Sequence, residues 1–237
     1  MIVVRWWWRL IRFGFRLLYN EMAFTYDLVS KAVSMGQWRC WQRAALKHLK
    51  PGTQSLILEL AHGTGDLQLD LASAGYRSIG YDLSPYMGRI ASRKLQRHGV
   101  KARLVRGLAQ GLPFADESVD AIVCTFPTDF IFAESTLHEA WRVLRPEGRL
   151  VIVINGVFTG RGLMTRLLEG LYWITGQRPA HSEQPNPTCQ SGLAPGQEAF
   201  NRVMGVFRSC DFEAELKREP CQGSYAQVIV ADKITAR

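Results

Sequence analysis

The chain has 237 residues, of which 47% are hydrophobic and 21% are charged, and its formal net charge is +8. This length allows one large α/β domain or two small ones, with enough residues to bury a full-sized core. The composition is that of an ordinary globular protein and excludes a disordered or collagen-like chain.

The positive charge is concentrated at the N-terminus. Residues 1–50 carry nine basic and two acidic side chains, whereas residues 51–237 carry 20 and 19. A nucleic-acid-binding protein distributes Lys and Arg over the surface that follows the phosphates. The charge distribution therefore argues against a nucleic-acid partner and indicates a nearly neutral body behind a basic N-terminal segment.

The first predicted element is a basic amphipathic helix within residues 1–19, which read MIVVRWWWRLIRFGFRLLY. On a helix, one narrow face carries Arg5, Arg9, Arg12 and Arg16. A signal peptide or a membrane-spanning helix would not have four arginines through its middle. Two interpretations stay open: an interfacial helix on an anionic membrane surface, and a helix whose apolar face packs on the domain or on a partner subunit.

Residues 20–50 predict a helical lid or cap. Two helices are expected there, broken near Ser34–Gly36, and the second is amphipathic and ends before Pro51-Gly52.

From residue 51 onward, short apolar runs alternate with helical patterns. Strands are expected at 55–60, 76–82, 101–107, 118–126 and 148–155, and helices from 66 to about 74, at 84–99 and at 133–144. Such alternation predicts a parallel sheet with helices on both faces, and ligands bind such sheets at the carboxyl ends of the strands.

The C-terminal part is predicted to contain a helix at 160–176, a mobile Pro-, Ser- and Gln-rich loop at 177–197, and a further helix at 198–209. Strands at 212–219 and 225–233 are expected to complete the sheet as an antiparallel hairpin.

The cysteines point away from a disulfide framework or a zinc site. They are Cys40, Cys124, Cys189, Cys210 and Cys221, an odd number with no CxxC pair. We therefore expect no structural disulfide, no metal, and a reducing, cytoplasmic compartment, with the protein peripheral on the inner face of the membrane if residues 2–19 bind lipid.

The first strand leads into the sequence ELAHGTGD at residues 59–66. Gly63 and Gly65 allow a ligand to lie against the backbone, beside the free N–H groups of the helix that follows. The third glycine of a dinucleotide-binding loop is absent, which argues against a nicotinamide-dependent oxidoreductase. Asp82 ends the second strand, where a carboxylate can accept both hydroxyls of a ribose.

These motifs resemble those of the class I S-adenosylmethionine-dependent methyltransferases, in particular the ubiquinone/menaquinone-biosynthesis branch. The resemblance covers about 130 residues, from Tyr26 to Val153, through the ordered motifs ELAHGTGD, GYDLSPYM, GLAQGLPFADESVDAIV and LHEAWRVLRPEGRLVIV. It implies a Rossmann-like, seven-stranded, mostly parallel sheet, an enzyme that uses S-adenosyl-L-methionine, and a domain spanning 51–237.

The resemblance also implies the roles of individual residues. Glu59 would lie near the methionine amino group, and the backbone of residues 61–65 (Ala61, His62, Gly63 and Gly65 among them) would hold the methionine and ribose. Asp82 would bind the ribose hydroxyls, Leu83 and the stretch from Leu108 to Ala109 the adenine, and Thr125 would border the methyl group.

Two positions depart from the family pattern. Ala61 replaces the first glycine of the loop, and Leu108 stands where the family commonly has an acid for the adenine amino group. The candidates to replace that acid are Gln110 and a backbone carbonyl.

No catalytic residue is assigned, since the cofactor carries the reactivity and the protein mainly aligns the acceptor. On the acceptor side the candidates are Tyr26, which with Asp27 resembles a Tyr-Asp pair of the family's lid, Asp129, and Asn155; His138 is more typical of a surface position.

The sequence thus predicts a methyltransferase acting on a small, apolar, quinone- or lipid-like acceptor at the membrane surface. Two alternatives stay open: a methyltransferase of a soluble metabolite, and a non-catalytic binding or scaffold protein, which the departures at Ala61 and Leu108 would suit.

Overall fold

The computed structural model of this protein describes residues 26–50, 55–159 and 195–234. The predicted helices at 2–19 and 160–176, and most of the loop predicted at 177–197, lie outside these residues.

The centre of the molecule is a seven-stranded sheet with the strand order β3-β2-β1-β4-β5-β7-β6. The first five strands are β1 (Leu56–Leu60), β2 (Arg77–Asp82), β3 (Leu104–Arg106), β4 (Val119–Thr125) and β5 (Leu144–Phe158), and they pair in parallel. The last two, β6 (Phe212–Cys221) and β7 (Ser224–Lys233), form an antiparallel hairpin, with β7 also antiparallel to β5. The predicted fold class is confirmed.

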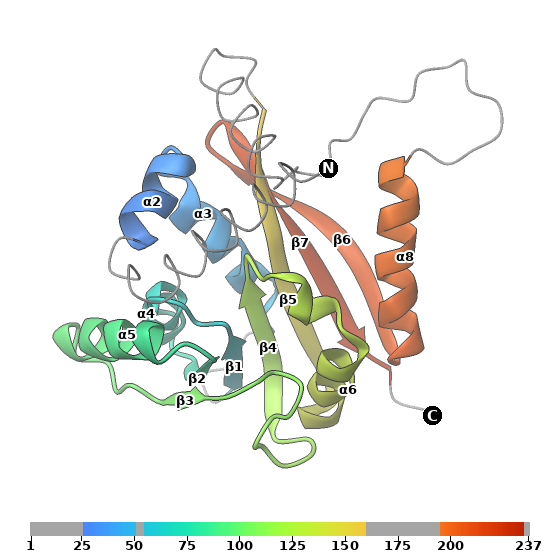
Figure 1. Ribbon diagram of the computed structural model, residues 1–237, viewed down its shortest axis with the longest axis horizontal. Coiled ribbons are helices and arrows are strands. Elements are labelled where there is room, and N and C mark those ends of the chain that lie inside the picture. Colours follow the sequence, from blue (N-terminus) through green and yellow to red (C-terminus); the bar gives the residue numbers. More distant parts are fainter. Residues whose placement is uncertain (1–25, 51–54, 160–194, 235–237) are drawn as a thin grey trace, which may run out of the picture.

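Helices cover both faces of the sheet (Figure 1). The described ones are α2 (Tyr26–Val33), α3 (Trp38–Arg43), α4 (Asp66–Ser73), α5 (Pro85–Arg97), α6 (Glu134–Val143) and α8 (Pro195–Ser209), with short 3₁₀ helices η2 (Ala44–His48) and η3 (Asp129–Phe132). One core lies between the sheet and α3, η2 and α4, and is centred on Trp41, Leu67 and Leu71. The other lies between the sheet and α6 and α8, around Leu137 and Phe207.

Two strands differ in length from the prediction. β3, at one edge of the sheet, has only three residues and pairs with β2 over Leu104–Arg106. β5 begins at Leu144, which pairs with Val119, and residues 145–148 then bulge out before Arg149 pairs with Ala121. The strand predicted at 148–155 therefore starts earlier, at Leu144, and is irregular before Arg149.

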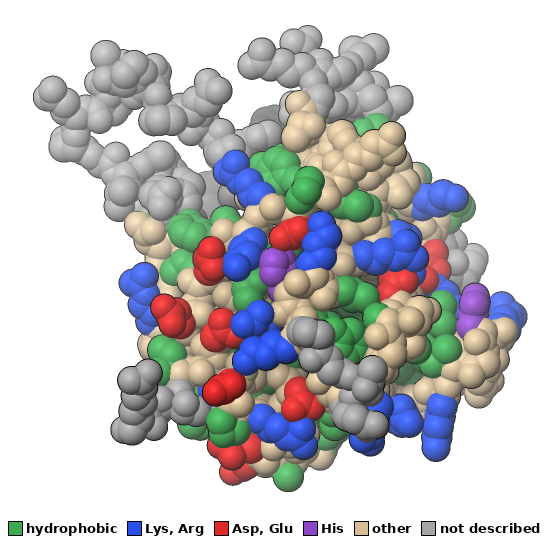
Figure 2. All heavy atoms as spheres, turned by 180° about the vertical axis from the view of Figure 1, so that it is seen from behind, with side chains coloured by type: hydrophobic (Ala, Val, Ile, Leu, Met, Phe, Trp, Pro, Cys, Tyr) green, Lys and Arg blue, Asp and Glu red, His purple; other side chains and the backbone are tan. Residues whose placement is uncertain are grey.

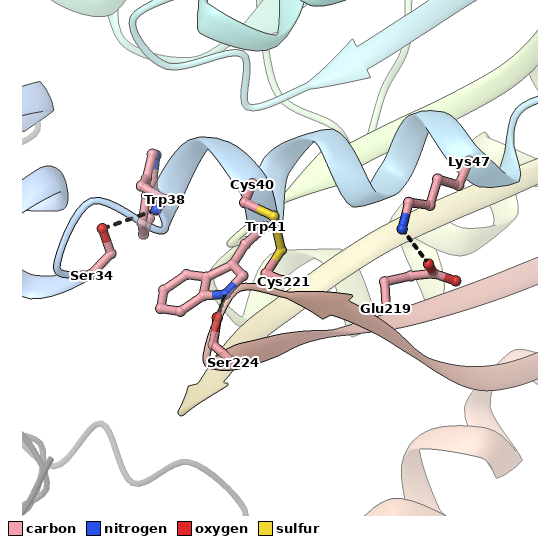
Figure 3. The surroundings of a disulfide bond; sticks show 8 residues. All are labelled: Ser34, Trp38, Cys40, Trp41, Lys47, Glu219, Cys221 and Ser224. Atoms are coloured by element: carbon pink, nitrogen blue, oxygen red, sulfur yellow. Dashed lines mark hydrogen bonds and ion pairs between the residues drawn. A yellow bond between two sulfur atoms is a disulfide. The ribbon is translucent and has the colours of Figure 1, made fainter. Parts of the chain in front are cut away.

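A disulfide joins Cys40 of α3 to Cys221 at the end of β6, across 181 residues of sequence (Figure 3). Beside it, Trp41 Nε1 donates a hydrogen bond to Ser224 Oγ at 3.0 Å, and Lys47 forms an ion pair with Glu219 at 2.9 Å. The Trp41 ring lies so close to Gly156 that a Cβ there would come within 2.1 Å of the ring. These contacts fix α3 to the β6–β7 hairpin and to β5.

The sequence-based expectation of no disulfide was wrong. The pairing depends on the fold bringing α3 beside β6, and neither the spacing nor the number of the cysteines reports that distance. Cys124 and Cys210 are free and buried. The argument from the cysteines for a reducing compartment loses its basis.

The outer surface carries mixed charges. Figure 2 shows acidic and basic side chains interspersed over the face opposite to that of Figure 1, in keeping with the near-neutral balance of residues 51–237. Within the described ranges, no helix has the length and hydropathy needed to cross a membrane.

Candidate active site

A cavity of about 630 Å³ opens at the carboxyl ends of β1, β2, β3 and β4. Its size is within the usual range for small-molecule sites. Most of the described side chains around it are apolar, and Asp82 is the one carboxylate among these described residues. The lining includes Leu60, Ala61, Gly63, Asp82, Leu83, Ser84, Met87, Arg106, Leu108, Ala109, Gln110, Thr125, Phe126, Thr128 and Phe130. This is the edge at which the sheet topology places a ligand site.

The loop between β1 and α4 forms one wall of the cavity. Gly65 precedes α4 with φ of +85°, and a Cβ at that position would come within 2.9 Å of the Ala91 Cβ on α5. Glycine is therefore required for α4 to begin so close to α5. Ala61 also adopts a left-handed conformation, with φ of +55°, and its N–H donates to Tyr81 O at 2.7 Å. Glycine adopts such a φ freely, whereas Ala61, which stands where the resemblance places a glycine, adopts it at a cost in strain.

Asp82 stabilises the β1–α4 loop and also faces the cavity. Its Oδ2 accepts a hydrogen bond from Gly63 N at 3.0 Å, and its Oδ1 accepts one from Ser84 N at 2.8 Å. An ionised carboxylate offers about four acceptor positions, so these two bonds leave capacity for two more donors. The geometry suits a ligand with a pair of hydroxyls.

The segment after β3 is held by polar contacts from the sheet and from α6. Tyr81 Oη lies 3.3 Å from Leu108 O, and Glu139 Oε2 accepts a hydrogen bond from Leu112 N at 2.6 Å. Arg142 donates to Leu112 O, Phe114 O and the Asp116 carboxylate, at 2.7–2.9 Å. These anchors position Leu108, Ala109 and Gln110 along the cavity. The hydrogen bonds from Arg142 lower the pKa of Glu139 below its usual value.

The end of β4 provides an aromatic wall. Thr125 is nearly buried, and Phe126, with φ of +50°, follows it and lines the cavity. Trp38 of α3 stacks on Phe126 with 3.9 Å between ring centroids and 24° between the ring planes. Helix α3 thereby supports a side chain of the site.

Glu59 lies beneath the loop rather than in the lining of the cavity. It is 1% exposed, and its Oε2 accepts a hydrogen bond from Gln68 Nε2 at 2.6 Å, while Gln68 Oε1 accepts one from Ser78 Oγ at 2.8 Å. Burial raises the pKa of Glu59 to about 8. Nearby, burial raises the pKa of the Cys124 thiol well above its usual value. Cys124 is thus a neutral core residue.

Several other residues singled out from the sequence are not among the described residues that line this cavity. His62 is 4% exposed and lines a second, smaller cavity of about 350 Å³, where burial lowers its pKa. Asp129 is exposed at the start of η3, and His138 is exposed on α6. Asn155 follows the bulge in β5, and its Oδ1 is buried without a hydrogen-bond partner among the described residues. The side chain of Tyr26 is outside the described part of the chain.

A polar cluster that joins α2 to the β1–α4 loop was missed from the sequence. Lys94 of α5 contacts Asp27 at 2.6 Å, and both Thr64 and Asp66 at 3.1 Å. Tyr81 and Arg142 were missed as anchors of the loop after β3. No spacing signals these partners, since each contact joins different elements of the fold.

The comparisons with known proteins agree with this geometry. Residues 58–152 match a family model described as a methyltransferase domain. The chain is 33% identical over 192 residues to a demethylmenaquinone methyltransferase of a Mycobacterium species (strain KMS), covering 81% of this chain and 80% of that protein. The chain belongs to the S-adenosylmethionine-dependent methyltransferase family.

Within that family it is similar to enzymes of ubiquinone and menaquinone biosynthesis. It is 37% identical over 139 residues to a demethylmenaquinone methyltransferase of Thermus thermophilus, covering 57% of this chain and 63% of that relative. Thus the chain spans less than two thirds of the length of this relative. The methyltransferase fold itself matches a structure from Methanococcus maripaludis with a TM-score of 0.62 and 18% identity, covering 92% of this chain and 95% of that one.

The residues that line the 630 Å³ cavity fit S-adenosyl-L-methionine, the cofactor of this family. They include an acid at the end of β2, a loop with left-handed backbone after β1, and apolar side chains at the ends of β2 and β3. No cluster of three or more His, Cys, Asp or Glu able to hold a metal ion occurs in the part of the chain that the structure describes.

Proposed function

We propose that the protein transfers a methyl group from S-adenosyl-L-methionine to a small, apolar acceptor. The observation that carries the proposal is the Asp82 carboxylate, which faces an otherwise largely apolar cavity while already holding the Gly63 and Ser84 amides. When bound, the cofactor supplies a methyl group activated by a positively charged sulfur. The contribution of the chain is to bind and orient the two reactants and to exclude water.

Individual residues are assigned as follows. Asp82 accepts hydrogen bonds from the ribose hydroxyls, and the backbone of residues 61–65 holds the methionine portion. Leu83, Leu108 and Ala109 contact the adenine, and Gln110, which lines the same cavity, replaces the missing acid. Glu59 stays beneath the loop, near the methionine ammonium, and Thr125 borders the methyl group.

The acceptor is proposed to be a quinone-like ring. The relatives named above act in quinone biosynthesis, and the Phe126 ring, supported by Trp38, offers a flat apolar wall at the end of β4. Aromatic rings stack favourably on such a surface. Asp129, Asn155 and Tyr26 are assigned to the acceptor side.

Action at a membrane surface is proposed as part of this function. The arginine face and aromatic residues of 2–19 support it. So do α2, on which Leu28 is 71% exposed and Val29 39%, and the turn after it, in which Met35 is 41% exposed. Removing residues 2–19 is expected to abolish cosedimentation with anionic vesicles; retained binding, or a change in oligomer size alone, would instead favour a protein contact.

Titration calorimetry with S-adenosylmethionine and S-adenosylhomocysteine tests the cofactor site. We expect micromolar binding by the natural protein and loss of at least about tenfold in affinity for Asp82→Ala, since each charge-assisted hydrogen bond contributes about 1.5–3 kcal/mol. The control is Glu213→Ala, which removes an exposed acid on β6. Absence of binding at millimolar cofactor would overturn the enzyme and favour a scaffold role.

A further inference from the structure

Helix α2 is attached to the cofactor loop through a compact polar cluster. Asp27, in its first turn, accepts hydrogen bonds from Thr64 Oγ1 at 2.5 Å and from Lys94 Nζ at 2.6 Å. Lys94 Nζ also reaches Thr64 Oγ1 and Asp66 Oδ1, both at 3.1 Å. The cluster therefore contains side chains from α2, from the β1–α4 loop, from α4 and from α5.

The Lys94 ammonium is the centre of this cluster. It has three donors, and the three contacts to Asp27, Thr64 and Asp66 use all of them. Its side chain is only 19% exposed, and that of Asp66 only 21%. Arg39 of α3 also faces Asp66, at 3.7 Å, but its shorter contact is with Asp70 at 2.8 Å. Lys94 is therefore the cation that holds Asp27 and Asp66 together.

The cluster adjoins the cofactor loop directly. Thr64 directly follows Gly63, which lines the cavity, and Asp66 follows Gly65. Thr64 is 5% exposed. Lys94 lies on the helix whose first turn supplies Ser84, Pro85 and Met87 to the cavity. A displacement of the β1–α4 loop therefore moves Thr64, which contacts Asp27 directly, and Asp66, which contacts it through Lys94.

The other end of α2 has a fixed support. Helix α3 is held by the Cys40–Cys221 disulfide and by Trp41. Between the two helices, Met35 and Gly36 adopt positive φ values of 49° and 81°. Thus α2 is joined by a short turn to a fixed helix, and the polar cluster holds its first turn through Asp27.

From these contacts we infer that Lys94 is a positioning residue that couples the cofactor loop to α2. The inference rests on the proposed function and goes beyond it. Cofactor that binds against residues 61–65 fixes Thr64 and Asp66, and through Lys94 it fixes Asp27 and the first turn of α2. Occupancy of the cofactor site thereby sets the position of the helix that precedes the aromatic wall of Trp38 and Phe126.

Hydrogen exchange of α2 and cofactor titration test this coupling together. In the natural protein, S-adenosylmethionine is expected to slow the exchange of the α2 amides. In Lys94→Met that slowing is lost and the dissociation constant rises about tenfold, whereas Lys94→Arg retains part of both effects. Asp27→Asn, at a position whose side chain is 43% exposed, is the milder variant should Lys94→Met fail to fold. Lys101→Met, at an exposed lysine after α5, is the control and leaves both readouts unchanged.

A double-variant comparison separates coupling from general destabilisation. Asp27→Asn combined with Lys94→Met should weaken cofactor binding no more than Lys94→Met alone, because both remove the same contact. Unchanged affinity and unchanged α2 exchange in folded Lys94→Met would overturn the inference. If the natural protein binds no cofactor, the proposed function fails by itself. The role of Lys94 in holding α2 is then tested on the unliganded protein. Faster hydrogen exchange of the α2 amides in Lys94→Met than in the natural protein supports that role, and equal exchange overturns it.

Discussion

Trp38 and Phe126 stack across 88 positions of sequence, with 3.9 Å between their ring centroids. Phe126 lines the cavity at the end of β4, and Trp38 comes from the helical segment that precedes the sheet domain. The N-terminal helices are therefore part of the site: they support a side chain in its wall. The disulfide between α3 and the β6–β7 hairpin holds these helices in that position.

Removing the disulfide is expected to destabilise the protein and to release α3 from the hairpin. Replacing both Cys40 and Cys221 by serine should lower the free energy of unfolding by about 2–5 kcal/mol, since the closed loop spans most of the chain. Urea denaturation measures the loss. Dithiothreitol should shift the natural protein toward the stability of the double variant and leave that variant unchanged; an equal response of both to dithiothreitol would contradict the pairing.

Replacing Ala61 by glycine is expected to stabilise the protein and tighten cofactor binding. Ala61 has φ of +55°, which costs a side-chain-bearing residue roughly 1–2 kcal/mol, and glycine removes this cost. Glycine also makes the unfolded chain more flexible, which lowers stability by about 0.4–1 kcal/mol. The net gain is about 1 kcal/mol, read as a higher denaturation midpoint. Ala74→Gly, at the end of α4 with φ of −82°, should instead destabilise. A loss of stability in Ala61→Gly would show that the Ala61 methyl makes a contact that outweighs its strain.

Glu59 is expected to make stability depend on pH. Burial raises its pKa in the folded protein to about 8 from an ordinary 4.5, so between these values the folded state binds more protons than the unfolded state. The contribution of this group to the free energy of unfolding is therefore fully present below pH 4.5. It is lost as the pH rises from there through 8, by an amount on the order of a few kcal/mol.

Glu59→Gln tests that dependence. The amide keeps an acceptor for Gln68 but cannot ionise, so the difference in stability between pH 5 and pH 8.5 should shrink in the variant. Urea denaturation at the two pH values measures it, with Glu213→Gln, an exposed acid, as the control. Equal pH dependence in Glu59→Gln and the natural protein would assign the effect to other groups.

Arg142→Lys is expected to loosen the segment that carries Leu108, Ala109 and Gln110. The guanidinium bridges Leu112 O, Phe114 O and two carboxylates, a set of contacts that a single ammonium does not reproduce. We expect a loss of about 1–3 kcal/mol and faster hydrogen exchange in residues 107–116. Arg145→Lys, whose described carboxylate partner is Asp120 on the surface, is the matched control; similar exchange in the two variants would refute the anchoring role.

Much of the fold was predictable because its signals are local. The apolar runs of β1, β4 and β5 and the amphipathic pattern of α5 report burial residue by residue. Gly65 and Asp82 report a turn and an acid at the strand ends, where parallel topology gathers ligand-binding groups. Ala61 and Leu108 were recognisable as departures, but only the φ of Ala61 shows what the first one costs.

The sequence by itself determined the order of strands and helices, the sheet class and the edge at which the site lies. Tertiary structure alone decided the contacts between distant segments: Cys40 with Cys221, Lys94 with Asp27 and Thr64, and Arg142 with the segment after β3. The physical reason is that periodicity encodes which face of an element is buried, whereas a disulfide or an ion pair requires two side chains to be brought within a few ångströms. That distance is a property of the folded chain.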